Sequence, residues 1–160
     1  MSNPHSTLTH VAWPDAFTPE EMDRVEAIGE GLTPQGAVIA DQEGQRALER
    51  IRITKMAWIT LGDDTKWLYD RVWNMARTLN EQFYQFDLRG FSDPFQYTLY
   101  RDSDGGHYDW HVDQGPTPVQ RKLSLTLQLS DPADYEGCDL ELRAGNHSRR
   151  LAIIGLPHQR

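Results

Sequence analysis

Apolar residues recur with a helical period in the first half of this sequence. Residues 18–21, Thr-Pro-Glu-Glu, can form a capping box, so we expect a helix from there to about residues 29–31. A second helix, capped by Asp63 or Asp64, is predicted to continue to about Asp87, because its apolar positions are three or four residues apart. Two helices are therefore expected before the chain changes character.

Strands dominate the second half, where apolar and polar residues alternate with a period of two. One strand is already expected between the helices, at residues 51–60. From residue 91 onward, turn residues separate five further predicted strands: 94–101, 107–113, 121–130, 138–143 and 150–154. Helices followed by strands favour an antiparallel sheet with the helices on one side, because a wound parallel sheet needs helices between its strands.

Length and composition fit one globular domain over residues 1–160, with a helical part at about 14–90 and strands at about 91–155. The chain carries 24 acidic against 16 basic side chains, a formal charge of -8, so we expect no nucleic-acid partner. No apolar run approaches the roughly 20 residues that span a bilayer, so no membrane partner is expected. A single cysteine, Cys138, and the absence of a signal-peptide pattern predict a cytoplasmic protein.

Two successive His-x-Asp units, 107–109 and 111–113, stand in residues 105–113, Gly-Gly-His-Tyr-Asp-Trp-His-Val-Asp. In an extended strand, residues two apart project to the same side, so His111 and Asp113 can approach one ion together. An imidazole and a carboxylate, completed by a distant second histidine, form the facial triad that binds Fe(II) and leaves positions open for other ligands. The spacing alone also fits an ion pair on the surface, because so short a motif recurs by chance.

Segments on both sides of this cluster extend the pattern. Residues 95–100, Phe-Gln-Tyr-Thr-Leu-Tyr, precede it, and residues 121–124 and 129–137 follow it. Together with the cluster, they resemble the 2-oxoglutarate and Fe(II)-dependent dioxygenases of the prolyl 4-hydroxylase-like group, over roughly residues 13–143. The resemblance implies a mainly β fold with N-terminal helices, the double-stranded β-helix or jelly roll.

The same resemblance implies an enzyme and its cofactors. With Fe(II), 2-oxoglutarate and O2, such an enzyme hydroxylates an unactivated C–H bond and converts 2-oxoglutarate to succinate. Ascorbate, which restores oxidised iron in this group, is a further expected cofactor. The expected substrate is a peptidyl residue such as proline, or a small molecule.

Carried over position by position, the resemblance assigns His111 and Asp113 as metal ligands. The unit that begins at His107 fits less well, because the glycine and the tyrosine of the family motif would then stand at the wrong offsets. The aromatic side chains of Tyr108 and Trp110 are expected to pack on the face opposite the ligands.

The remaining site residues are assigned in the same way. Tyr100 matches a tyrosine that contacts 2-oxoglutarate in the family. Tyr97 is the alternative, because this sequence has two more residues between Tyr100 and Gly105 than the family motif has. His147 and His158 are available as the distal metal ligand, and His158, which follows a proline, is the candidate that we assign. Lys122 is the nearest substitute for the basic residue that pairs with the far carboxylate of 2-oxoglutarate.

Beyond about residue 150, the sequence no longer resembles the family. We therefore expect a chain that is truncated at its C-terminus, with an incomplete jelly roll. Two alternatives to an active enzyme stay open. One is a metal-binding jelly roll without normal catalysis, and the other is a jelly-roll module that binds a carbohydrate or a protein.

Overall fold

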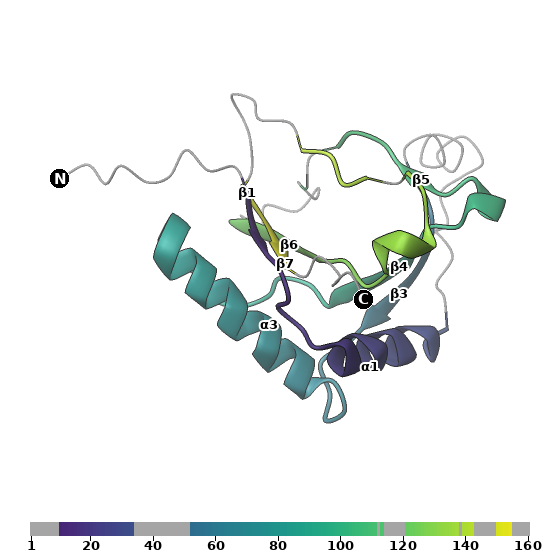
Figure 1. Ribbon diagram of the computed structural model, residues 1–160. Coiled ribbons are helices and arrows are strands. Elements are labelled where there is room, and N and C mark those ends of the chain that lie inside the picture. The colour runs from purple at the N-terminus through teal and green to yellow at the C-terminus, as the bar shows by residue number, and fades with distance from the viewer. Residues whose placement is uncertain are drawn as a thin grey trace, which may run out of the picture.

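The computed structural model describes residues 10–33, 52–111, 113, 121–137, 139–142 and 150–154. The helices in these ranges are α1 (Pro19–Glu30), α3 (Lys66–Leu79), the π-helix η1 (Asn80–Tyr84) and the 3-10 turns η2 (Asp102–Asp104) and η3 (Pro132–Asp134). The strands are β1 (His10–Trp13), β2 (Arg52–Ile53), β3 (Lys55–Ile59), β4 (Phe95–Leu99), β5 (His107–Tyr108), β6 (Leu123–Leu127) and β7 (Arg150–Ile154). Figure 1 shows α1 and α3 along one side of the strands. None of the helices described here has the length and hydropathy needed to cross a bilayer.

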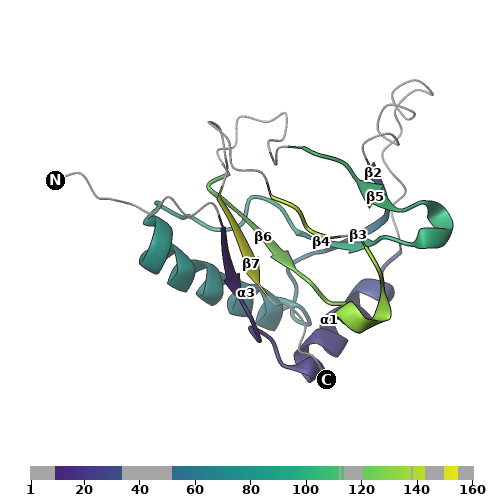
Figure 2. The ribbon, with the colours of Figure 1, turned by 45° about the horizontal axis from the view of Figure 1, so that its top comes forward.

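The strands pair into three small sheets. β3 and β4 form an antiparallel ladder that runs from Lys55 opposite Leu99 to Ile59 opposite Phe95. β2 and β5 form a second antiparallel ladder, two residues long. In the third sheet, β7 lies between β1 and β6 and is parallel to both, as Figure 2 shows.

The parallel sheet differs from the antiparallel arrangement that the order of elements predicts. A parallel pair needs a crossover connection of about a dozen residues or more. Residues 128–149 connect β6 to β7 and exceed that length, while β1 and β7 lie at opposite ends of the described chain. The alternation of side chains locates strands but does not identify their partners, so it left the direction of these two pairings undetermined.

The predicted capping box at the start of α1 is confirmed. The backbone N–H of Glu21 donates to the Thr18 hydroxyl at 3.2 Å, and the backbone N–H of Thr18 donates to the Glu21 carboxylate at 2.9 Å. These two bonds satisfy N–H groups that have no partner within the helix. The first helix therefore begins where the sequence signal places it and ends at Glu30, inside the predicted range.

The second helix begins later than predicted. Residues Asp63 and Asp64 do not cap it, and the N-cap position is Thr65. The hydroxyl of Thr65 donates to the carbonyl of Thr60 at 2.6 Å and accepts from the backbone N–H of Gly62 at 2.9 Å. Thr65 closes the preceding loop through these two bonds and so sets the start of α3. Because its hydroxyl is occupied by the loop, it forms no cap bond to α3.

The strand predicted at 150–154 is confirmed as β7, most of the other predicted strands are shorter in the structure, and one is wrong. Residues 51–60 divide at Thr54, whose hydroxyl donates to the carbonyl of Leu99 at 2.8 Å, so that β2 pairs with β5 and β3 pairs with β4. The strand predicted at 107–113 is formed only in β5. Residues 139–142 form no strand, because their alternating leucines are exposed to solvent and do not pack against a sheet.

The core lies between the two helices and the β3–β4 ladder. Its buried side chains include Val25, Ala57, Ile59, Leu68, Val72, Met75, Leu79 and Tyr97. Gly29, near the end of α1, lies against the ring of Tyr97. A Cβ atom placed on Gly29 would be 2.4 Å from that ring, so α1 approaches β4 as closely as a glycine allows.

Replacing Gly29 with alanine should therefore destabilise the protein, although alanine favours a helix over glycine by about 1 kcal/mol. The added methyl group would force Tyr97 or α1 to move, which typically costs about 1–3 kcal/mol. Urea unfolding should show this loss in Gly29→Ala. Gly62→Ala is the matched control, because the nearest atom to its Cβ position is 3.9 Å away and its φ is not positive. Equal stability of Gly29→Ala and the wild type would contradict this account of the packing.

Candidate functional site

The candidate site lies in the segment that begins with β5. The chain reaches β5 from β4 through the turn η2, which Gly105 ends with a φ of 66°. A Cβ atom on Gly106 would lie 2.7 Å from a backbone nitrogen in the same turn. The conformation at Gly105 therefore favours glycine, and the close backbone at Gly106 leaves no space for a side chain. Lys55 Nζ lies 3.4 Å from Asp104 Oδ2, and this ion pair connects the turn to β3.

His111 and Asp113 face each other, and both side chains are partly exposed. Nε2 of His111 lies 3.2 Å from Oδ1 of Asp113. Nδ1 of His111 lies 2.8 Å from the carbonyl oxygen of Asp109, which can only accept a hydrogen bond, so Nδ1 carries the hydrogen. In the neutral imidazole, Nε2 then presents its lone pair to the carboxylate. Two acceptors at this distance repel each other unless a positive charge lies between them, and either a proton or a metal ion supplies it.

The geometry of this pair fits a transition-metal ion. Nitrogen and oxygen ligands lie about 2.0–2.2 Å from such an ion, so two adjacent ligand atoms are about 3 Å apart. A metal-binding histidine usually donates its other N–H to a carbonyl or carboxylate, as His111 does to Asp109. In the described part of the chain, no three His, Cys, Asp or Glu side chains come together to hold a metal ion. His147 and His158 lie outside the described residues.

Tyr108 contacts the metal-binding candidate directly and does not pack on the opposite face as expected. Its ring stacks on the His111 imidazole, with 3.6 Å between the ring centroids and 9° between the planes. The pKa of the Tyr108 phenol is raised above its usual value, mainly by burial and also by the charge of Asp113. The charge of Arg52 opposes this shift. The irregular backbone after β5 removes the strict alternation on which the expectation rested. Trp110 is 45% exposed, so it is not packed in a core either.

Arg52 is the residue of this site that the sequence reasoning missed. Its guanidinium carbon lies 4.5 Å from the centroid of the Tyr108 ring, and the β2–β5 ladder places the two residues directly opposite each other. Both terminal nitrogens of Arg52 donate to Oε1 of Gln96 in β4, at 3.4 and 3.3 Å. Nothing in the sequence around Arg52 distinguishes it from any other basic residue in a strand. Only the register of β2 on β5 brings it to this position.

The two tyrosines considered for 2-oxoglutarate lie in different surroundings. Tyr97 is 7% exposed and packs against α1, where burial, Glu26 and Glu30 raise the pKa of its phenol. Tyr100 is 36% exposed, and it is one of the groups that raise the pKa of the Tyr108 phenol. Lys122 is exposed to solvent beside β6.

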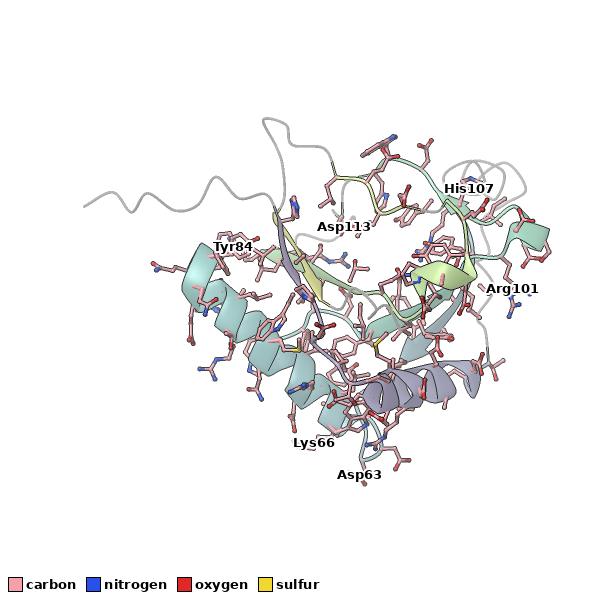
Figure 3. The ribbon with its side chains drawn as sticks, in the orientation of Figure 1. Asp63, Lys66, Tyr84, Arg101, His107 and Asp113 are labelled. Carbon is pink, nitrogen blue, oxygen red and sulfur yellow. The ribbon has the colours of Figure 1, made fainter. Side chains whose placement is uncertain are left out.

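The site and the helices occupy different sides of the strands. Figure 3 shows His107 and Asp113 on the side away from Lys66, which marks the start of α3. In β4, the apolar side chains of Tyr97 and Leu99 contact the core, whereas the alternate residue Gln96 reaches Arg52. The β3–β4 ladder therefore separates the hydrophobic core from the candidate site.

Comparison with known proteins gives two relatives over most of the chain. A protein named PKHD-type hydroxylase from Pseudomonas fluorescens is 28% identical over 144 residues, which cover 85% of this chain and 59% of that protein. A PKHD-type hydroxylase from Pseudomonas putida gives the same identity and coverage. No protein-family model matches the chain, and no solved structure matches it. The chain is thus similar to two proteins named as hydroxylases and spans 59% of their length.

Proposed function

We propose that the chain carries the metal-binding part of an Fe(II)- and 2-oxoglutarate-dependent hydroxylase. The observation that carries this proposal is the pair of facing acceptors, His111 Nε2 and Asp113 Oδ1, 3.2 Å apart. The resemblance of the surrounding sequence to such dioxygenases supports it, and so do the names of the two relatives. The antiparallel β2–β5 and β3–β4 ladders beside the site support a jelly-roll arrangement of this part of the chain.

In this proposal, His111 and Asp113 are two of the three protein ligands, and His158 is the proposed third. When bound there, Fe(II) with 2-oxoglutarate and O2 supplies the oxidation of a C–H bond in a peptidyl residue or a small molecule. The carbonyl of Asp109 keeps the hydrogen of His111 on Nδ1, so that Nε2 stays available as a ligand. The partial exposure of both ligands leaves room for the co-substrate.

Tyr100 is the proposed contact for the far carboxylate of 2-oxoglutarate. Tyr100 is partly exposed, whereas Tyr97 is buried with its ring packed against α1. A phenol donates a hydrogen bond to a carboxylate without requiring a charge of its own. Lys122, also accessible, is the proposed source of the positive charge that a dicarboxylate needs.

Loss of the His111 imidazole should abolish metal binding, since it removes the ligand nitrogen. An anaerobic titration of Fe(II) in the presence of 2-oxoglutarate, followed by the visible charge-transfer band, should give no band in His111→Ala. His107→Ala should keep most of it, because His107 is not part of the pair that His111 Nε2 forms with Asp113 Oδ1. Loss of the band in His107→Ala alone would move the site to the first His-x-Asp unit.

Removal of the Tyr100 hydroxyl should weaken the binding of 2-oxoglutarate and leave that of the metal unchanged. A hydrogen bond to a charged acceptor contributes about 1.5–3 kcal/mol, so Tyr100→Phe should raise the 2-oxoglutarate concentration at half saturation by about tenfold or more. Tyr97→Phe is the matched control and should leave it near the wild-type value. The opposite result would assign the contact to Tyr97.

A further inference from the structure

We infer that Tyr108 is a positioning residue that holds the His111 imidazole in its ligand orientation, and that Arg52 holds Tyr108 in place. The inference rests on the proposed function, because it concerns the same metal site. It adds Tyr108 and Arg52 to the site. Neither the His-x-Asp spacing nor the family resemblance gives these two residues a positioning role.

The first step of the argument is the stacking of the two rings. A centroid separation of 3.6 Å at 9° places the Tyr108 ring face to face with the imidazole. His111 lies beyond the end of β5, where no ladder holds the backbone in the described residues. The hydrogen bond from Nδ1 to the carbonyl of Asp109 fixes one edge of the imidazole. The ring of Tyr108 fixes its plane, and the two contacts together direct Nε2 to Asp113.

The second step is the position of Arg52. The imidazole covers one face of the Tyr108 ring, so the guanidinium, 4.5 Å from the ring centroid, must lie against the other face. A cation over the face of an aromatic ring is attracted by the quadrupole of that ring. Tyr108 is therefore held between Arg52 and His111, and it cannot turn about its side-chain bonds without losing both contacts.

The third step is the anchoring of Arg52 itself. Its backbone is paired with that of Tyr108 in the β2–β5 ladder, and its terminal nitrogens donate to Gln96 of β4. The stack therefore begins in the long β3–β4 ladder and ends at the proposed metal ligand. Because Arg52 contacts the ring of Tyr108 and that ring contacts His111, we expect the effect of Arg52 on the metal site to pass through Tyr108.

Nuclear magnetic resonance of the metal-free protein tests the stack directly. Protons of an imidazole that lies face to face with a phenol are shifted upfield by the ring current. This shift of the His111 ring protons should be present in the wild type and in Tyr108→Phe, and it should vanish in Tyr108→Leu. Persistence of the shift in Tyr108→Leu would overturn the inference without bearing on the metal.

Titration with Mn(II), used as an air-stable probe, tests the consequence for binding. Tyr108→Leu should raise the Kd for Mn(II) by about three- to tenfold. Tyr108→Phe should keep the wild-type Kd, because the ring and not the hydroxyl makes the contact. Trp110→Leu is the matched control for loss of a neighbouring exposed aromatic ring and should leave the Kd unchanged. A Kd for Tyr108→Leu equal to that of the wild type, or a Tyr108→Phe variant as weak as Tyr108→Leu, would overturn the inference.

The Arg52→Gln variant completes the test. On its own it should raise the Kd by less than Tyr108→Leu does, and in the Tyr108→Leu background it should add nothing, because its effect passes through the ring. Fully additive effects would overturn the proposed order of contacts. His111→Ala separates this inference from the proposed function. If the wild type does not bind Mn(II), or if His111→Ala binds it equally well, the proposed metal site itself is wrong.

Discussion

The antiparallel pairing of β3 with β4 is the constraint on which both the core and the candidate site depend. Its five residue pairs fix which side chains point to the helices and which point away. Ala57, Ile59 and Tyr97 are buried under α1 and α3. On the other face, Gln96 reaches Arg52 and so begins the series of contacts that ends at His111. A shift of one residue in this register would exchange the two faces, removing Tyr97 from the core and Gln96 from the site.

Helix starts were predictable from the sequence to the extent that their signals are local. The capping box at Thr18 and Glu21 is formed by residues three apart, so short-range chemistry determines it. The start of α3 was misplaced because Thr65 bonds back to Thr60, and no rule for caps includes such a loop. The parallel pairing of β7 with β1 and β6 was missed for a related reason. Strand partners depend on contacts between distant segments, which alternation of side chains does not encode.

The candidate site shows the same division between local and distant contacts. The spacing of His111 and Asp113 predicts that they approach each other, and the structure places their ligand atoms 3.2 Å apart; their role as metal ligands stays a prediction. The position of Tyr108 could not be predicted from a strict period of two, because the backbone leaves the strand after that residue. Arg52 is separated from Gln96 by 44 positions, and no spacing rule connects them.

Two contacts orient the ring of His111: a hydrogen bond to the carbonyl of Asp109, and the stacked ring of Tyr108, which Arg52 supports from a distant part of the sequence. The carbonyl of Asp109, two residues away, determines which nitrogen carries the hydrogen. That contact alone leaves the imidazole free to rock about the hydrogen bond, since a single bond at one edge does not fix a plane. The stacked ring of Tyr108, held by Arg52 from the far side, removes that freedom. A His-x-Asp pair in a polypeptide without this support would present the same ligand atoms but would lose conformational entropy when it binds a metal ion. In the proposed metal site, the strands would therefore contribute to binding by ordering the pair before the ion arrives.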